Sequence, residues 1–172
     1  MKNTVRWLPA LCWGILLAAW LTLVFVFSSQ SYEQQSIQPL LLRFFSFQDL
    51  VRWLPDITIK YRYTTVNSHS NPYKFIEFLF RKGAHLFVYA TFASIFFMFV
   101  RSFNTRRVFR AILVTLLVVI VVPAVDEWNQ LRSEHRTGNT TDILLDFTGG
   151  CIGLSICLLF LALARLWKFL RK

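Results

Sequence analysis

The chain has 172 residues, of which 55% are apolar and only 16% are charged, and its formal net charge is +10. A soluble domain of this length could not bury so much apolar surface, so the composition excludes an ordinary soluble protein and indicates an integral membrane protein. The positive charge lies beside apolar runs rather than in one compact patch. We therefore expect no nucleic acid among its partners.

Four apolar runs are long enough to cross a bilayer, whose apolar core takes about 20 helical residues to span. They cover approximately residues 8–27, 84–100, 108–125 and 143–164. The first run is longer than the roughly 7–15 apolar residues of a secretory signal peptide, so we expect it to be retained. We predict an all-α integral membrane protein with four transmembrane helices and a single membrane domain over residues 1–172.

The connection over residues 28–82 is too long to be a plain turn. Apolar residues recur with a helical period over 40–54 but are interrupted by charges, which predicts a helix lying at the membrane interface. Residues 57–66 begin with an alternation of apolar and polar residues, which predicts a short β segment. Its pairing partner is either Thr64–Ser68 or another copy of the protein. Asn71–Pro72 then predicts the cap and the first turn of the next helix.

Ten basic residues and no acidic ones flank the apolar runs on one side of the predicted membrane. The other nine Lys and Arg residues, and all nine Asp and Glu residues, lie in the remaining connections or at their edges. Positive charge marks the cytoplasmic side of membrane proteins. We therefore expect both termini and the 101–110 turn to be cytoplasmic, and residues 28–82 and 126–142 to be extracellular. The ten residues are Lys2, Arg6, Arg101, Arg106, Arg107, Arg110, Arg165, Lys168, Arg171 and Lys172.

Polar side chains collect at the predicted outer ends of all four spans, whereas the inner ends carry only basic residues. Ionisable groups near membrane depth are costly, so they usually face the interior of a helix bundle and often mark function. We therefore predict an outward-facing polar site. Its candidate residues are Gln30, Arg81, Lys82, His85, Tyr89, Asp126, Glu127, Gln130, Arg136, Asp142 and Asp146.

Asp146 lies inside the fourth apolar run, one helical turn after Asp142. A carboxylate facing lipid would be expensive, so Asp146 needs a partner, for which Arg81, Arg136 and His85 are the candidates.

Three glycines, Gly149, Gly150 and Gly153, follow Asp146 along the fourth run. The spacing of Gly149 and Gly153 places two small residues on one helix face, where a neighbouring helix can approach closely. We expect these glycines to serve helix packing just below the charged cluster.

Each candidate also has a purely structural explanation. Arg81 and Lys82 could extend toward the membrane interface, His85 could be a satisfied core histidine, and Asp126 with Glu127 could be a helix-end charge pair. No spacing typical of a metal site and no cofactor or nucleophile motif is present, so we expect neither a metal nor a cofactor. The three cysteines all fall within predicted spans, which indicates packing rather than a disulfide framework.

The motifs occur in a recognisable order along the chain. They read FSSQS at 27–31, RKGAHLFVYA at 81–90, DEWNQ at 126–130, HRTGNTTD at 135–142 and ILLDFTGGCIG at 143–153. This order resembles the VanZ-like membrane proteins, whose hallmark is a DExxQ element followed by an Arg, an Asp and a Gly-rich helix. The matching positions are Gln30, Lys82, His85, Tyr89, Asp126, Glu127, Gln130, Arg136, Asp142, Asp146, Gly149 and Gly153.

Three features depart from that family pattern. The family usually has a Pro shortly before the Arg, where this chain has Ser133, Glu134 and His135, and Asp146 stands where Asn is frequent. The connection over 28–82 also exceeds the family minimum.

The resemblance implies a bacterial cell-envelope protein of the plasma membrane, because the namesake of the family is associated with resistance to the lipoglycopeptide teicoplanin in Gram-positive bacteria. It implies membrane lipids as partners, together with lipid II or a teicoplanin-like amphiphile bound at the outer leaflet. A homo-oligomer is a further expectation.

Two other functions compete with binding. A membrane-embedded enzyme acting on a lipid-linked precursor would use Glu127 or His85 as general base, with Arg136 or Lys82 stabilising an anion. A proton-coupled carrier is the least favoured, since it needs polar groups along the full depth of the bundle and the inner halves of the spans are nearly all apolar.

Overall fold

The computed structural model describes residues 7–61, 64–130 and 140–171. The chain divides into two compact units. We call them the helical unit, which comprises Met1–Ser29 and His85–Lys172, and the loop unit, which comprises Gln30–Ala84.

Four long helices within the described residues have the length and composition needed to cross a membrane. They are α1 (Trp7–Ser28), α4 (Pro72–Phe103), α5 (Val108–Gln130) and α6 (Thr140–Leu170). The four predicted spans are therefore confirmed as helices. Each helix extends beyond its predicted apolar run, because the backbone hydrogen bonds of a helix continue through polar residues that a hydropathy pattern leaves out.

The start of α4 follows the predicted cap. The side-chain Oδ1 of Asn71 accepts a hydrogen bond from the backbone N–H of Lys74 at 3.0 Å, and the backbone carbonyl of Asn71 accepts one from the N–H of Phe75 at 3.0 Å. Pro72 occupies the first helical position, where its missing N–H costs nothing. Helix α5 also contains a proline, Pro123, and continues past it to Gln130.

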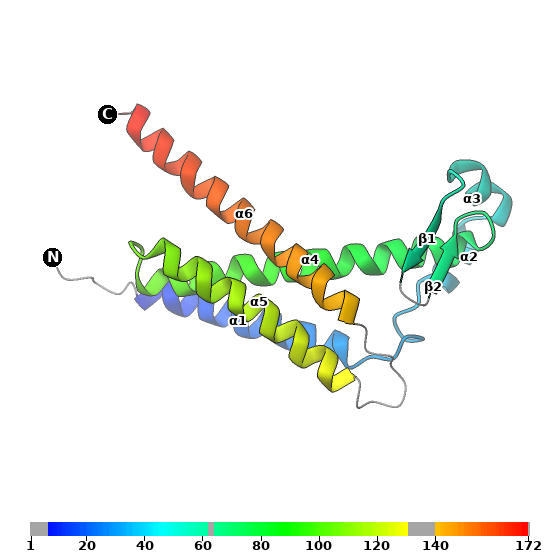
Figure 1. Ribbon diagram of the computed structural model, residues 1–172, viewed down its shortest axis with the longest axis horizontal. Helices are drawn as coiled ribbons and strands as arrows, with labels where there is room; N and C mark the ends of the chain where they lie inside the picture. The colour runs from blue at the N-terminus through cyan, green and yellow to red at the C-terminus, as the bar shows by residue number, and fades with distance from the viewer. Residues whose placement is uncertain (1–6, 62–63, 131–139, 172) are drawn as a thin grey trace. The chain divides into compact units, whose positions relative to one another are not determined.

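Within the helical unit, α1, α5 and the 85–103 part of α4 lie side by side, and α6 runs across them at an angle (Figure 1). Tyr89, Phe92 and Ala93 of α4 form one buried cluster with Val119 of α5. A second buried cluster joins α4, α5 and α6 through Phe97, Ala111 and Leu154. These apolar contacts position the beginning of α6 against α4 and α5.

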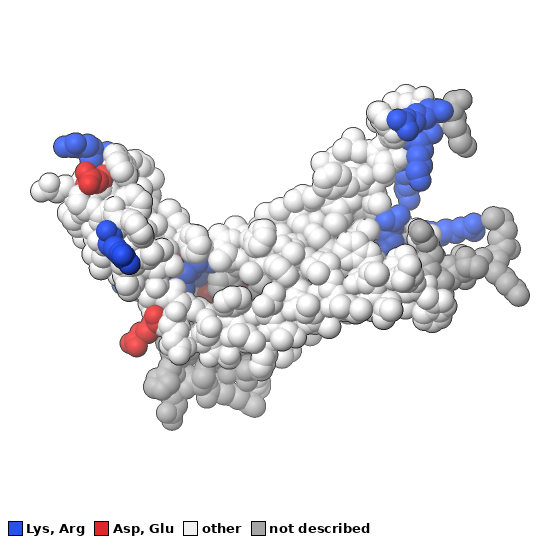
Figure 2. All heavy atoms as spheres, turned by 180° about the vertical axis from the view of Figure 1, so that it is seen from behind, with Lys and Arg blue, Asp and Glu red and all other residues white. Residues whose placement is uncertain are grey.

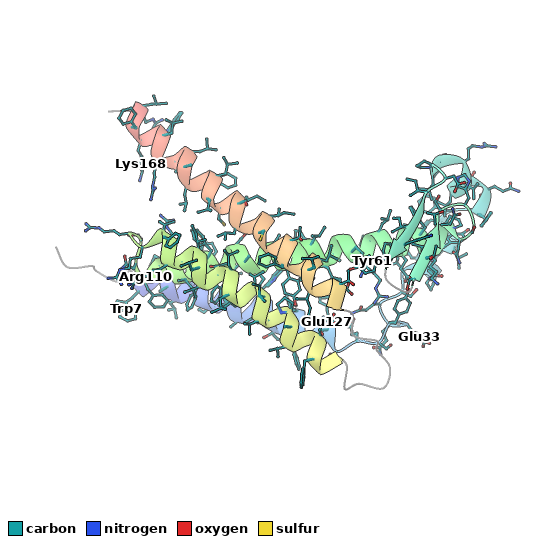
Figure 3. All side chains as sticks on the ribbon, viewed as in Figure 1. Trp7, Glu33, Tyr61, Arg110, Glu127 and Lys168 are labelled. Carbon is teal, nitrogen blue, oxygen red and sulfur yellow. The ribbon has the colours of Figure 1, made fainter. Side chains whose placement is uncertain are left out.

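The outer faces of the long helices carry many exposed large apolar side chains, such as Ile15, Leu117 and Phe160. Figure 2 shows a broad uncharged surface, with Lys and Arg gathered where α6 ends. In Figure 3, Trp7, Arg110 and Lys168 lie at one end of the helical unit, and Glu127 lies toward the other. An apolar flank of this extent in a four-helix unit is what lipid contact requires.

The loop unit contains two short helices, α2 (Gln38–Phe44) and α3 (Phe47–Trp53), where the sequence predicted a single helix over 40–54. That prediction is wrong because Phe45 and Ser46 adopt extended backbone conformations. The Ser46 side chain accepts a hydrogen bond from the N–H of Asp49 and donates one to the Asp49 carboxylate at 2.6 Å. Such reciprocal capping begins a new helix instead of extending the old one.

The β segment predicted over 57–66 is divided into two antiparallel strands, β1 (Thr58–Tyr61) and β2 (Thr64–Asn67). The pairing partner within 64–68 is thus confirmed, whereas a single strand through residue 66 is wrong. Ile59 pairs with Val66, and Val66 is buried. Ser68 closes the hairpin, since its hydroxyl accepts from the N–H of Ile57 at 2.9 Å and donates to the carbonyl of Pro55 at 2.7 Å.

Candidate functional site

A buried carboxylate lies against an imidazole between α4 and α6. His85 Nδ1 is 3.0 Å from Asp146 Oδ1, and the side chain of Asp146 is only 3% exposed while that of His85 is 38% exposed. With Asp146 ionised, Nδ1–H donates to the carboxylate, and Nε2 of the neutral ring is a proton acceptor. The contact with Asp146 therefore holds the His85 ring in one orientation, with Nε2 as the basic nitrogen.

The glycines that follow Asp146 explain why α6 approaches α4 closely enough for this contact. A Cβ atom at Gly149 would lie 2.5 Å from the carbonyl oxygen of Leu86, and one at Gly153 would lie 2.0 Å from that of Ala90. Both obstacles are backbone atoms of α4, so neither can move without moving the helix. The predicted packing role of Gly149 and Gly153 has its structural basis in this interface.

Gly150 faces α5 instead of α4. A Cβ atom at Gly150 would lie 2.1 Å from a methyl carbon of Val119 in α5. Val119 is 1% exposed and belongs to the same buried cluster as Tyr89. The beginning of α6 is thus packed between α4 and α5, and the carboxylate of Asp146 is held there one turn before the first glycine.

Of the three partners predicted for Asp146, the structure shows His85. Arg81 instead contacts the loop unit, donating from Nη2 to Gln35 Oε1 at 3.3 Å and stacking its guanidinium 3.9 Å from the centre of the Tyr32 ring. Arg136 lies outside the described residues.

Two other predicted residues of the helical unit are also buried. Glu127 in α5 is 7% exposed and Tyr89 in α4 is 4% exposed. Asp142 lies in the first turn of α6, where the positive end of the helix dipole favours a carboxylate. Figure 3 shows Glu127 near the end of α5, toward the beginning of α6. The side chains of Asp126 and Gln130 lie outside the described residues, although the backbone of both belongs to α5.

The loop unit contains a buried acid that the sequence reasoning missed. Glu77 in α4 is 0% exposed. One carboxylate oxygen, Oε1, accepts from the backbone N–H of Ile37 at 3.2 Å, and the other accepts from the Tyr32 hydroxyl at 3.1 Å and from the Gln38 amide. These bonds connect the first turn of α2 to α4. The available signal was an acid placed among aromatic residues in the stretch FIEF.

The predicted cations of the loop unit both lie over aromatic rings. Arg81 stacks on Tyr32, and Lys82 Nζ lies 4.3 Å from the centre of the Tyr61 ring in β1. Tyr61 in turn meets Phe78 edge to face at 5.5 Å. Cation–π contacts of this kind fix the direction of a charged side chain without neutralising its charge. Gln30, also predicted for the site, is partly buried at the start of this unit.

Comparison with protein families gives one match, to the VanZ/LLP1 family, over residues 13–161. That range covers most of the chain and reaches into all four long helices. The chain belongs to the VanZ/LLP1 family. No curated protein and no solved structure matched the chain.

As a VanZ-family chain with four long apolar helices, this is a multi-pass membrane protein. The matched range contains both the His85–Asp146 pair and the glycines that hold it, as well as the buried Glu77 of the loop unit. Over the described residues, no three His, Cys, Asp or Glu side chains lie close enough together to hold a metal ion. The chemistry that the geometry itself offers is acid–base and hydrogen-bonding chemistry from His85, Asp146 and Glu127.

Proposed function

We propose that this VanZ-family protein binds an amphiphilic or lipid-linked ligand at the outer face of a bacterial plasma membrane, and thereby lowers susceptibility to teicoplanin-type lipoglycopeptides. The observation that carries the proposal is the His85–Asp146 pair, 3.0 Å apart, at a helix interface with an apolar flank. A carboxylate is costly to bury in such surroundings, and a ligand-binding role accounts for keeping Asp146 there beside a partly exposed imidazole.

The orientation of the chain supports an outward-facing site. Arg110 and Lys168 lie at one end of the helical unit, and Glu127 lies toward the other (Figure 3). Residues 1–29, 85–125 and 147–172 contain no acid at all. Because basic residues remain on the cytoplasmic side, both termini are cytoplasmic in this proposal and the acidic end of the helical unit faces outward.

The groups at that end suit a ligand that has a polar head and an apolar body. His85 Nε2 can accept a proton or a hydrogen bond, and Glu127 can accept one from an amine or a hydroxyl group. The apolar side chains on the flanks of the helices would contact the lipid portion. Peptidoglycan precursors such as lipid II and lipoglycopeptides such as teicoplanin both combine these two parts.

A comparison of matched variants in cells tests the proposal. Glu127→Gln and His85→Gln each remove an ionisable group from the site, and Glu33→Gln makes the same chemical change at an exposed acid of the loop unit. With expression matched, wild type and Glu33→Gln should reduce the binding of fluorescent teicoplanin to cells and raise survival. Both site variants should lose this protection. No protection by wild type would contradict the proposal.

A membrane-embedded enzyme acting on a lipid-linked cell-wall precursor is the second candidate. It is favoured by one observation, namely that Asp146 contacts His85 through Nδ1, which assigns the role of general base to the other ring nitrogen, Nε2. In this case His85→Gln should abolish turnover of lipid II in liposomes and leave its binding nearly intact. Product analysis by mass spectrometry checks this. Equal loss of binding and of turnover would favour the binding function.

A further inference from the structure

A small cavity lies at the basic end of the helical unit, away from the His85–Asp146 pair. Its volume is about 160 Å³, and Pro9 and Trp13 of α1 line one side of it. The remaining lining is Met98, Arg101 and Ser102 of α4 with Thr105 of the following turn. The walls are therefore mostly apolar, with one guanidinium and two hydroxyl groups among them.

Arg101 is partly buried, and one of its N–H groups lacks a hydrogen-bond partner in the part of the chain that the structure describes. Its Nε atom is inaccessible to solvent and has no hydrogen-bond partner among the described residues. The Ser102 hydroxyl would not donate to a bound anion, because it already donates to the carbonyl of Phe99 at 2.6 Å. A buried N–H group left unpaired costs free energy, and the guanidinium to which it belongs is the only cation among the described residues that line the cavity.

Over the residues that the structure describes, the helical unit places no Asp or Glu side chain at that end. Residues 1–29, 85–125 and 147–172 contain no Asp or Glu, so every acid of the helical unit lies between residues 126 and 146. A like charge acts on Arg101 instead, since Arg165 of α6 is close enough to repel it. Arg106 and Arg107 of the turn add further positive charge. The counterion of this cluster must therefore come from outside the chain.

We propose that this cavity is a binding site for the phosphate group of an anionic phospholipid. Arg101 would pair with the phosphate oxygens, using the fork of N–H donors that suits that geometry. The Thr105 hydroxyl could donate a further hydrogen bond, and the apolar walls formed by Pro9, Trp13 and Met98 would contact the glycerol and the first acyl carbons. Anionic lipids are concentrated in the cytoplasmic leaflet, which is the side that basic residues favour. The site is independent of the ligand proposed for the opposite end.

Lipid selectivity of the intact wild-type protein is the first test. The full chain is purified in detergent, exposed to equal amounts of dioleoyl phosphatidylglycerol and dioleoyl phosphatidylcholine, and analysed by native mass spectrometry. Both lipids carry a phosphate, but the choline group of phosphatidylcholine cancels that charge, whereas phosphatidylglycerol keeps a net negative charge. Attraction of one basic residue to a net negative lipid corresponds to about fivefold in affinity, so phosphatidylglycerol adducts should exceed phosphatidylcholine adducts by about that factor. Equal retention of the two lipids would overturn the proposal, and this test needs no variant to fold.

A matched pair of variants then separates the cavity from general charge attraction. Arg101→Gln removes the cavity cation, whereas Arg106→Gln removes an exposed cation from the same end. Arg101→Gln should abolish the preference for phosphatidylglycerol, Arg101→Lys should retain part of it, and Arg106→Gln should leave it almost unchanged. Equal loss in Arg101→Gln and Arg106→Gln would overturn the assignment to the cavity.

Inorganic phosphate distinguishes a lipid headgroup from a free anion. If the site recognises a lipid, phosphate at millimolar concentration should displace phosphatidylglycerol only weakly, because phosphate lacks the apolar part that Trp13 and Met98 contact. Trp13→Ala should likewise weaken lipid retention without a change in charge. Complete displacement by phosphate, combined with an unaffected Trp13→Ala variant, would show a free-anion site and overturn the lipid assignment.

Discussion

His85 of α4 and Asp146 of α6 are joined by a contact of 3.0 Å between Nδ1 and Oδ1, although 61 residues separate them in sequence. The contact lies directly before the segment in which Gly149 and Gly153 bring the two helix backbones together. A polar pair and a glycine interface therefore depend on the same approach of α6 to α4. Changing either one should affect the other.

Removing the imidazole should destabilise the protein more than neutralising the acid. His85→Ala removes the imidazole contact of the Asp146 carboxylate, which is 2% exposed, and should cost about 2 kcal/mol of unfolding free energy. Asp146→Asn keeps an oxygen that accepts from Nδ1–H and should cost less. Thermal unfolding of the full chain in detergent compares them. Equal stability of both variants and wild type would contradict the importance of the pair.

A methyl group at Gly153 should disrupt the α4–α6 interface. Gly153→Ala would place Cβ 2.0 Å from the carbonyl oxygen of Ala90, so the helices must separate, and overpacking of this kind costs about 1–3 kcal/mol. Gly83→Ala is the matched control, because a Cβ there meets nothing within 4 Å. Alanine is the better helix former, so Gly83→Ala should be neutral or stabilising by up to about 1 kcal/mol. Thermal unfolding distinguishes the two, and similar behaviour would argue against close packing at Gly153.

Replacing Glu77 should loosen the loop unit locally. In Glu77→Gln, an amide NH₂ group replaces one carboxylate oxygen. This donor then faces another donor, either the N–H of Ile37 or the hydroxyl of Tyr32 and the amide of Gln38, so hydrogen bonding on that side is lost. A buried bond lost in this way costs about 2 kcal/mol. Hydrogen exchange of residues 31–38 should accelerate in Glu77→Gln and remain unchanged in Glu33→Gln, whose side chain is exposed. Equal protection in all three proteins would show that Glu77 does not hold this segment.

The parts of the structure that the sequence predicts well are those that depend on local composition. Length and hydropathy are sufficient to locate α1, α4, α5 and α6. A long apolar run in lipid forms a helix because its backbone polar groups must be hydrogen-bonded within the segment. The break between α2 and α3, which the predicted single helix omitted, also has a local signal in the sequence, because Ser46 and Asp49 have the spacing of a capping box.

The Glu77 cluster could not be predicted in the same way. Its donors, Tyr32, Ile37 and Gln38, precede Glu77 by about 40 residues and belong to a connection without a clear pattern. A helical period says which residues share a face but not which distant segment covers that face. For the same reason, the sequence gives three candidate partners for Asp146, and it is the packing of α6 on α4 that brings His85 into contact with it.

Alkaline pH should weaken the contact between Tyr32 and Glu77. Burial, and secondarily the negative charge of Glu77, raise the pKa of Tyr32 above its ordinary value. Because the pKa of Tyr32 is higher in the folded chain, the protonated tyrosine stabilises the folded state. This contribution is fully present below about pH 10, where the tyrosine of the unfolded chain is also protonated, and it is lost as pH rises through the folded pKa. Protection of residues 31–38 from proteolysis should therefore fall above about pH 10 in wild type. Tyr32→Phe should lack this step, and an identical pH profile in both proteins would exclude Tyr32 as its source.

Thiol labelling should show which end of the helical unit faces the cytoplasm. In a background with Cys12, Cys151 and Cys157 replaced by serine, Thr65→Cys introduces a thiol in the hairpin and Thr105→Cys introduces one in the turn after α4. Both positions are exposed, so differences in labelling report on the membrane barrier rather than on burial.

The basic residues around the 101–110 turn predict the result, since positive charge is retained on the cytoplasmic side. A membrane-impermeant maleimide should label Thr65→Cys in intact cells, and it should label Thr105→Cys only after the membrane is permeabilised. The reverse pattern would place the His85–Asp146 end of the helical unit inside the cell. An outward-facing ligand site would then be contradicted, whereas the packing of α6 against α4 would stand unchanged, because it does not depend on which side of the membrane each end occupies.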